Sequence, residues 1–572
     1  MSTLAHEQAT NETCDVIVVG SGGGGLTAGV TAACLGLNVV LLEKTDAFGG
    51  LTANSGGGVW IPCNPAALKS GIQDSVEAAR AYIQQGAGDA YDADLVDAFL
   101  KHGPEMIDFL DQKTDVKFMA AIGRPDYHPN TPGASISGRT IHPVPINGRE
   151  LGEEIHRLKM PAPELTFMGI MIKPGPDLLH FLNAFRSWTS FKVVTLRVLR
   201  FGLDWIQYQR SMDLANGNAL MARLGKSFFS HGGDLRTSSP ATGLICDQGR
   251  VAGVRYQSQK GEVHLYARKG VVLATGGFAH NTALREMYFN HLKKGQAYHS
   301  PAPPSNTGDG IELALDAGVA INSRHSTPAG WAPVSMLPTG DGQFKAFPHL
   351  IDRQKPGFIA VTRKGHRFVN EANSYHDVGR ALIKACEGEP EVCGFLIADY
   401  PTMRRYGMGA VKPAPFPYRS HLKTGYLICA DSLEELAFKA GIDVTNFLTT
   451  VSDFNAAAQG GTDPMFGRGD NVYNRYNGDA THGPNPCVAP IKKAPFFAMR
   501  WTVGELGTFV GIKGDVHGRA LNEQGEVIPG LYAAGNDLAN IFGGDYTAGG
   551  ATIGPGMVFG YLAAHHMASL RA

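Results

Sequence analysis

The sequence has no closely spaced pair of cysteines of the kind that builds a disulfide framework or a zinc site. Its 8 cysteines are scattered between positions 14 and 487, with no C-x-x-C pair and no histidine-rich ligand spacing beside them. Scattered thiols of this kind are typical of proteins in a reducing compartment. We therefore expect no metal site, no disulfide and a cytoplasmic location.

Long apolar runs and an excess of one charge are also missing. The chain contains no stretch of about 18 uncharged apolar residues, so we expect no membrane span. The first 15 residues lack a basic segment followed by an apolar one, so we expect no signal peptide. The formal net charge of -1 gives no electrostatic reason to expect a nucleic acid as partner. At 572 residues the chain is too long for one ordinary core, which predicts two domains.

Glycine, in contrast, is plentiful at 72 residues, and it clusters. The first cluster lies in a strand–turn–helix–strand pattern, CDVIVVG, SGGGGLTAGVTAACLG and LNVVLLEK. Here Gly20, Gly22 and Gly25 form G-x-G-x-x-G. The first glycine permits a tight turn, the second lets backbone approach a pyrophosphate, and the third allows close helix–strand packing. The helix N-terminus that follows presents free N–H groups to phosphates.

Glu43 ends the second strand, near the spacing at which an acid accepts hydrogen bonds from ribose hydroxyls. An acid there also repels a 2′-phosphate, which argues against NADP. The stretch FGGLTANSGGG (48–58) follows in an E-x5-G-G pattern and brings more backbone N–H groups and the Ser55 hydroxyl toward the phosphates or a flavin. Because no second complete G-x-G-x-x-G stands on its own strand–helix unit, we expect FAD and no separate NAD(P)H site.

Two more apolar strands end in glycines, RKGVVLATGGF (268–278) and GLYAAGND (530–537). Their wide separation predicts an α/β fold in which a Rossmann-like FAD-binding domain is interrupted by an α+β catalytic or substrate domain. We place the FAD-binding domain at 1–290 plus 491–572, with a helical insertion at about 145–225. The catalytic domain is placed at 291–490.

The segment 177–210 is apolar at near-helical spacing and carries several basic residues, Lys192, Arg197, Arg200 and Arg210 among them. One interpretation is a basic amphipathic helix that rests on a membrane or covers an apolar substrate entrance. The other is a helical insertion packed on the core or used as an oligomer contact. Both stay open at this point, so a cytoplasmic protein with peripheral membrane association is one expectation.

The chain resembles the 3-ketosteroid Δ1-dehydrogenases, within the fumarate-reductase type of flavoproteins. The resemblance covers most of the chain and is strongest at VVGSGGGGLTAG, FGGLTANSGGGVWIP, GRPDYHPNTPG, GVVLATGGF, NTGDGIELALDAG, GHRFVNEANSYHD, GELGTFVGI and GLYAAGNDLANIFGGDYTAGGATIGPG. It implies an enzyme that introduces a double bond alpha,beta to a ring ketone, as in 3-oxosteroid 1-dehydrogenation. Since no His or Cys stands in a motif that suggests a covalent flavin link, we expect FAD to bind non-covalently.

The resemblance also implies catalytic roles. The tyrosine that takes the proton alpha to the carbonyl corresponds to Tyr375, in NEANSYHD. The carbonyl oxygen would be held by the Tyr546 hydroxyl and the backbone N–H of Gly550, in DYTAGG, and Tyr127, in PDYHP, would support the base. Flavin N5 would take the hydride from the beta carbon. Such fixed dipoles suit a developing enolate, and His376 and Asp377 are further candidates for tuning Tyr375.

The cofactor-binding residues expected from the motifs and the resemblance lie in seven stretches of the chain. They are Gly20, Gly22, Gly25, Glu43, Lys44, Gly50, Leu51, Thr52, Ser55, Gly56, Gly57, Ala274, Thr275, Gly276, Asp309, Gly535, Asn536, Thr552 and Ile553.

The last motif departs from the family pattern. Steroid enzymes of the family often have H-x-Y-x-G-P-G-G/A, whereas residues 544–550 here are GDYTAGG, with Asp545 present and the proline missing. Phe496 and Phe497 leave no hydroxyl in their region. These differences support ketone chemistry more strongly than a steroid skeleton. They leave open a non-steroid cyclic ketone or a 4,5-dehydrogenation.

Two rival functions remain. A fumarate- or urocanate-type flavin reductase would clamp a carboxylate with arginines, but Tyr and Gly stand at those places, although Arg367 and Arg380 flank the first motif. A non-catalytic flavin-fold binding protein would not need the full glycine and tyrosine set. The expected partners are therefore a small apolar ketone (a steroid or another cyclic ketone) and an electron acceptor, a quinone or another compound.

Overall fold

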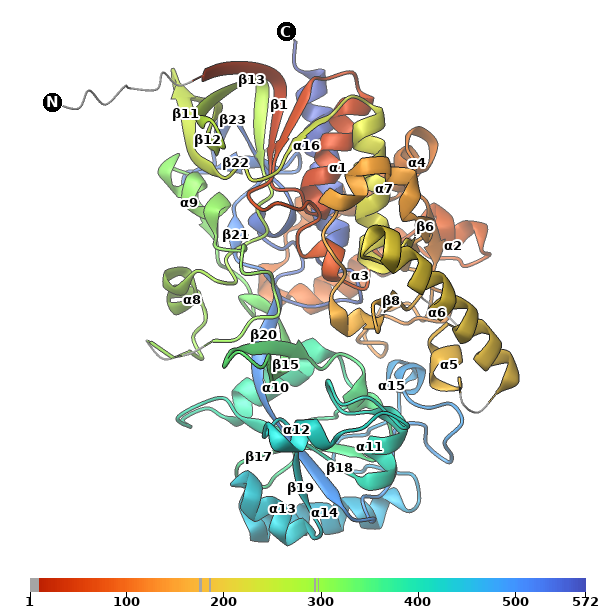
Figure 1. Ribbon diagram of the computed structural model, residues 1–572. Coiled ribbons are helices and arrows are strands. Elements are labelled where there is room, and N and C mark those ends of the chain that lie inside the picture. Colours follow the sequence, from red (N-terminus) through yellow and green to blue (C-terminus); the bar gives the residue numbers. More distant parts are fainter. Residues whose placement is uncertain (1–9, 174–176, 185–186, 293–294, 297, 572) are drawn as a thin grey trace, which may run out of the picture.

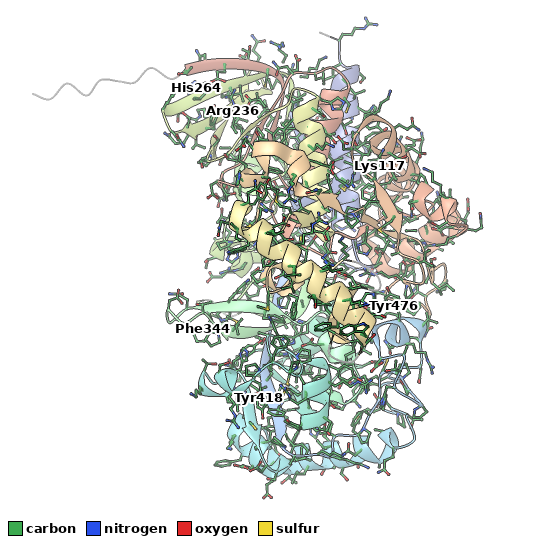
Figure 2. The ribbon with its side chains drawn as sticks, turned by 45° about the vertical axis from the view of Figure 1, so that its right-hand side comes forward. Lys117, Arg236, His264, Phe344, Tyr418 and Tyr476 are labelled. Carbon is green, nitrogen blue, oxygen red and sulfur yellow. The ribbon has the colours of Figure 1, made fainter. Side chains whose placement is uncertain are left out.

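The computed structural model describes residues 10–173, 177–184, 187–292, 295–296 and 298–571. Two sheets of different kinds organise the chain, one at each end of the molecule (Figure 1). Arg236 and His264 lie at the end that holds the first sheet, and Tyr418 lies at the end that holds the second (Figure 2).

The first sheet has eight strands, and its centre is parallel. β1 (Thr10–Val19) lies between β2 (Val39–Leu42) and β13 (Gly261–Leu273), parallel to both. β13 pairs in turn with β23 (Val527–Ala533), and β2 pairs with β10 (Asp234–Arg236), again in parallel. The three strand-then-glycine units therefore lie side by side, as the sequence pattern predicts. The remaining strands are antiparallel, β11 (Ala241–Asp247), β12 (Arg250–Ser258) and β22 (Arg519–Leu521).

Two helices from opposite ends of the chain pack together on this sheet. α1 (Gly23–Cys34) and α16 (Ile553–Ser569) are buried along most of their length. Gly24 of α1 faces the backbone of Gly556 in α16. A methyl group added to Gly24 would lie 2.9 Å from the Gly556 carbonyl oxygen. Such close contact needs glycine, because a larger side chain would separate the helices. α3 (Val76–Ala87) and α4 (Ala93–Lys113) complete this part of the fold, together with α9 (Asp309–Asp316).

The second sheet has six strands, largely antiparallel. Its long central strand is β20 (Phe496–Thr508), which pairs with β15 (Ala329–Pro338), β18 (Gly394–Asp399) and β19 (Ile428–Ala430). The edges are β16 (Phe344–Pro348) and β17 (Phe358–Thr362). α10 (Tyr375–Ala385), α11 (Tyr400–Tyr406), α12 (Arg419–Lys423), α13 (Leu433–Ala440), α14 (Val444–Ala458) and α15 (Val472–Asn477) surround it. We propose that the second domain consists of the expected 291–490 together with β20, which follows it in the sequence.

The insertion at about 145–225 is closed at its base by a short antiparallel pair, β6 (Ile146–Asn147) with β9 (Asp213–Leu214). It contains α5 (Asp177–Leu182) and α6 (Trp188–Tyr208) and leads into α7 (Asn216–Ser230), which packs on α1. α6 runs along the outside of the molecule toward α15, where Tyr476 lies (Figure 2). Among the described residues, no helix is both long and apolar enough to cross a membrane.

Candidate active site

The glycine turn after β1 is closed against the neighbouring strand. Gly20 has φ +104°, and a methyl group there would collide with the carbonyl group of Ala274, at the end of β13. A methyl group on Gly25 would collide with the carbonyl oxygen of Gly20. Around Gly22, in contrast, an added methyl group would meet no atom within 4 Å. The three glycines thus have the roles of a dinucleotide turn: two allow close packing, and the middle one keeps open the space that a pyrophosphate would need.

The loop after β2 folds back against this turn. The Thr52 hydroxyl accepts a hydrogen bond from the Gly23 N–H at 3.1 Å. Ser55 Oγ donates to the Thr52 carbonyl at 2.8 Å and accepts from the Gly57 N–H at 3.0 Å. Gly50 has φ +53° and lies close to the backbone of Gly22. The expected stretch Gly50–Gly57 therefore borders the N-terminus of α1.

The acidic residue after β2 is held by local donors. One Glu43 carboxylate oxygen accepts from the Ser21 hydroxyl at 2.5 Å, and the other accepts from Thr45 N–H at 2.9 Å. Next to it, Lys44 Nζ lies 2.7 Å from Asp309. The carboxylate thus stands at the edge where the parallel strands end, which is where a dinucleotide ribose binds in such sheets.

The third border of this space comes from the end of the chain. Thr275 and the Gly277 N–H both donate to the buried Asp537, which ties the end of β13 to the turn after β23. That turn contains the remaining expected residues, and a small cavity lies there, lined by Gly535, Asn536, Thr552, Thr508 and Phe559, among others. Ile553 reaches toward Gly23 of α1. The structure therefore brings the glycine turn, the loop after β2, the end of β13 and the turn after β23 together around one helix N-terminus, an arrangement that fits an adenine dinucleotide.

Three tyrosines from distant segments lie close together next to these expected cofactor-binding residues. Tyr127 lies in the loop between β4 (Phe118–Ala120) and β5 (Thr140–Pro143), Tyr375 is the first residue of α10, and Tyr546 precedes α16. The ring centroids of Tyr375 and Tyr546 are 5.2 Å apart, and those of Tyr127 and Tyr375 are 5.6 Å apart. The Tyr127 hydroxyl donates to the Tyr375 hydroxyl at 3.3 Å. The cluster includes a residue from the second part of the fold, because α10 packs on β15 and β20 of the second sheet.

Gly550 adjoins the tyrosines and has a conformation that only glycine adopts freely. Its φ is +104°, and an added methyl group would lie 2.5 Å from the Gly58 carbonyl oxygen. Its carbonyl oxygen accepts from Trp60 and Gly554 N–H groups. Within the part of the chain that the structure describes, the Gly550 N–H donates to no protein acceptor. This amide is therefore available to a ligand.

A charged bridge joins the three segments that carry the tyrosines. His128 Nε2 lies 3.1 Å from one Asp377 oxygen, and His128 Nδ1 lies 3.7 Å from Asp545. Each of these residues stands within two positions of one tyrosine. Burial alone would lower the pKa of His128, but the carboxylates outweigh it and raise that pKa to about 9. A histidinium between two aspartates thus locks the tyrosine cluster.

Burial dominates the acid–base properties of the tyrosines. It raises the pKa of Tyr375 well above 10 and that of Tyr546 to about 12. Both are therefore neutral phenols that can donate hydrogen bonds. The candidate tuner His376 accepts the Trp331 N–H at 3.1 Å through Nδ1, and burial lowers its pKa to about 3, so it is neutral as well.

Two features of this site are missing from the sequence-based prediction. The bridge through His128 is one, although Asp377 was expected to influence Tyr375. The other is Arg124, whose Nη1 lies 3.0 Å from His142 Nε2 and whose guanidinium touches Gly549. Its position three residues before Tyr127, in GRPDYHP, was the only available signal.

Comparisons with known proteins point to the same cofactor. Residues 15–553 match the family described as FAD binding domain. The chain is 40% identical to 4-oxocyclohex-2-ene-1-carboxylate 5-dehydrogenase from Sinomonas cyclohexanicum, over 99% of this chain and 96% of the relative. It is 35% identical to 3-oxosteroid 1-dehydrogenase from Mycolicibacterium smegmatis, over 98% of both. A solved structure, 3-ketosteroid delta1-dehydrogenase from Sterolibacterium denitrificans in complex with 1,4-androstadiene-3,17-dione, superposes with a TM-score of 0.89 at 34% identity and covers 98% of this chain and 100% of that one.

The glycine turn predicts a contrast between two substitutions. Gly22→Val should leave the thermal stability of the apoprotein unchanged but abolish flavin retention, because its side chain would occupy only the ligand space. Gly25→Val should destabilise the fold itself, since it collides with backbone. Flavin absorbance after purification and thermal unfolding of the apoproteins measure both. Full flavin content in Gly22→Val would contradict this assignment.

The histidinium bridge predicts a specific pH dependence. A pKa raised from the unfolded value of 6.5 to about 9 stabilises the fold fully below pH 6.5, and this contribution is lost as the pH rises through about 9. The melting temperature of His128→Gln should therefore lie below that of the wild type at pH 6, and the difference should vanish near pH 10. His264→Gln, which removes a surface contact with Glu262, is the matched control and should show no such trend. A constant difference for His128→Gln across the pH range would show that the bridge is not ionic.

Proposed function

Since the chain belongs to the FAD-binding flavoproteins that include the 3-oxosteroid 1-dehydrogenases, we propose that it removes hydrogen from the ring carbons alpha and beta to a ketone. The comparisons confirm three sequence-based predictions: the family, the FAD cofactor and the class of reaction, which is dehydrogenation of a CH–CH bond. The relatives are named for two kinds of ring ketone, 3-oxosteroids and 4-oxocyclohexenecarboxylate. A steroid-type ring A and a monocyclic ketone share the same reacting atoms.

The proposal rests on two hydrogen-bond donors of one segment, Tyr546 and Gly550, which we assign to the same carbonyl oxygen. Tyr546 contributes a neutral phenol, and Gly550 contributes a backbone N–H with no acceptor among the described residues. A ketone oxygen bound by both would become an enolate-like oxygen as the alpha proton leaves. Fixed donors stabilise that developing charge, because they are already oriented before the reaction.

Tyr375 is placed to take the alpha proton. Its ring lies across from Tyr546, and it accepts a hydrogen bond from Tyr127. Burial and the neighbouring Tyr127 and Tyr546 all raise the pKa of Tyr375, so a phenolate formed at this position would be a strong base. The histidinium bridge keeps both tyrosines in place through their neighbours His128 and Asp377. We therefore assign Tyr375 as the base and Tyr127 as its support.

Dehydrogenation removes one proton and one hydride, and bound FAD supplies the two-electron acceptor for the hydride. The residues that would hold the cofactor are those that the structure gathers around the N-terminus of α1. Their role is to bind the dinucleotide, whereas the tyrosines orient the ketone and exclude water from it. Electrons then leave to an external acceptor, a quinone or another compound.

A fumarate- or urocanate-type reductase would need arginines that bind the substrate carboxylates, and the two candidates, Arg367 and Arg380, are not placed for this. Arg367 is bound to Glu371 and Asp463 within the second domain, with N–O distances of 2.7 and 2.8 Å. Arg380 is exposed on α10. Neither forms the pair of guanidinium groups that a small dicarboxylate needs. A binding protein without catalysis would have no use for the free amide of Gly550.

The outer face of α6 also points to a partner. Its apolar side chains are exposed at helical spacing, and the exposed fractions are 69% for Trp188, 67% for Leu196, 62% for Leu199, 70% for Leu203 and 79% for Ile206. Lys192 lies over the ring of Trp188, and Arg200 is exposed beside them. A helix with exposed aromatic, aliphatic and basic residues is typical of proteins that lie in a membrane interface. We propose that this face, part of the segment 177–210 (in which residues 185–186 lie outside those described), contacts a membrane.

The carbonyl clamp predicts the effect of removing a hydroxyl group. Tyr546→Phe and Tyr375→Phe should each keep the flavin absorbance but lower kcat on a ring ketone with an artificial acceptor, for Tyr546→Phe by about 100- to 1000-fold. Tyr400→Phe, at a position 39% exposed and outside the site, should remain unaffected. Activities near wild type in both site variants would exclude this mechanism.

The α6 face predicts binding to lipid vesicles. The wild-type protein should co-sediment with vesicles of phosphatidylcholine and phosphatidylserine, and Leu203→Glu with Ile206→Glu should abolish this. Phe438→Glu changes an 81% exposed apolar residue elsewhere and should have no effect. If the wild type instead stays in the supernatant and the α6 variants convert a dimer into a monomer, the face is an oligomer contact.

A further inference from the structure

Arg124 places a positive charge among the tyrosines of the site without a carboxylate to balance it. In the part of the chain that the structure describes, no Asp or Glu oxygen lies within 4.0 Å of its guanidinium, and the side-chain partner found is His142. His142 donates through Nδ1 to the Gly56 carbonyl at 3.2 Å, so its Nε2 accepts from Arg124. Burial lowers the pKa of His142 to about 3, which leaves this imidazole neutral.

Arg124 is half-buried, and the fully buried arginines among the described residues are satisfied differently. Each donates to carboxylates or to backbone carbonyls, as shown by Arg139 with Asp74 and Asp126, Arg367 with Glu371 and Asp463, Arg468 with Glu371, and Arg210 and Arg353 with several carbonyl oxygens. A guanidinium has five donors. Arg124 is therefore the exception, a half-buried guanidinium among the tyrosines whose remaining donors are open to a ligand.

The position of Arg124 relates the charge to the carbonyl clamp. Its Nη2 lies against Gly549, where an added methyl group would collide with it and would lie 3.4 Å from the Tyr127 hydroxyl. Gly549 directly precedes Gly550, whose amide is the proposed carbonyl donor, and adjacent Cα atoms are about 3.8 Å apart. The charge of Arg124 acts on Tyr127, Tyr375 and Tyr473 as well. A molecule bound at the clamp thus has a guanidinium within reach.

We infer that Arg124 binds a carboxylate of the substrate, so that the enzyme acts on ring ketones that are also acids. This inference rests on the proposed ketone dehydrogenation and narrows its substrate. A guanidinium and a carboxylate match in charge and in planar geometry, and the pair forms two parallel hydrogen bonds. The neutral His142 orients the guanidinium without neutralising it.

The short separation also limits the skeleton. Arg124 contacts Gly549, the residue that directly precedes the proposed carbonyl donor Gly550. A carboxylate bound by Arg124 must therefore lie close to the ketone. A single six-membered ring that carries both groups satisfies this requirement. An acid group at the far end of a four-ring skeleton does not. The substrate class is therefore a compact oxocyclohexane- or oxocyclohexenecarboxylate.

Arg124 has one competing role, the electrostatic tuning of the tyrosines or of the flavin. A tuning residue would affect every ketone to the same extent. A carboxylate-binding residue would affect only the acid, and chiefly its KM. The two roles are separated by comparing an acid with its neutral ester.

The experiment uses the FAD-loaded enzyme with 4-oxocyclohexanecarboxylate, its methyl ester and androst-4-ene-3,17-dione, with an artificial acceptor. The wild type should prefer the acid to the ester, and Arg124→Gln should lower kcat/KM for the acid by about 10- to 100-fold. The ester should change less than threefold, about the level of the control Arg268→Gln, a 58% exposed surface arginine paired with Asp15. Arg124→Lys should recover part of the loss, because it keeps the charge but not the two-pronged geometry. Flavin absorbance and the flavin reduction potential should stay unchanged.

Each other outcome has a distinct meaning. Equal losses on acid and ester, or a shifted flavin potential, would overturn the inference and assign Arg124 to tuning. Turnover of the ester or the steroid with no preference for the acid would also overturn it, while the ketone dehydrogenation would stand. If no ketone is oxidised by the wild-type holoenzyme, the proposed function itself fails.

Discussion

The site depends on one ionic contact, the histidinium of His128 between Asp377 and Asp545. Its three members come from a loop of the first domain, from the start of α10 in the second domain, and from the turn before α16. Each member fixes the tyrosine next to it. The Tyr127 N–H also donates to the Thr547 carbonyl at 2.9 Å, so the bridge and this backbone bond together hold the three segments beside each other. The geometry of the tyrosine cluster is therefore a property of the contacts between these three segments.

These contacts also explain the division of labour between the two sheets. The parallel sheet ends at the turn of Gly20 and at the N-terminus of α1, which suits phosphates and a dinucleotide. The antiparallel sheet carries α10 and thereby the proposed base. The tyrosines lie where the segments of the two parts meet, and burial there raises their pKa values and keeps the phenols neutral. Gly550, at φ +104°, has a backbone N–H for which no acceptor is found among the described residues.

Local sequence patterns predicted the strands of the first sheet that end in glycines. The composition of the second sheet and the surroundings of Arg124 depend on contacts between residues far apart in the sequence. The three strands that end in glycines could be recognised because each is a short continuous pattern, and they do lie side by side. The tyrosines followed from family resemblance, and their roles stay predictions. The contribution of β20 to the second sheet could not be predicted, because pairing across more than 100 residues leaves no local mark. The significance of Arg124 depends on the absence of a neighbouring carboxylate, which only three-dimensional coordinates reveal.

In the proposed mechanism, a phenol and a peptide amide bind the ketone oxygen, and this binding makes the neighbouring C–H bonds reactive. Anaerobic mixing of the purified yellow protein with a panel of compounds tests it most directly. Ring ketones should bleach the flavin, whereas the matching ring alcohol and succinate should leave it oxidised. Bleaching by succinate, or by the alcohol as readily as by the ketone, would contradict the account.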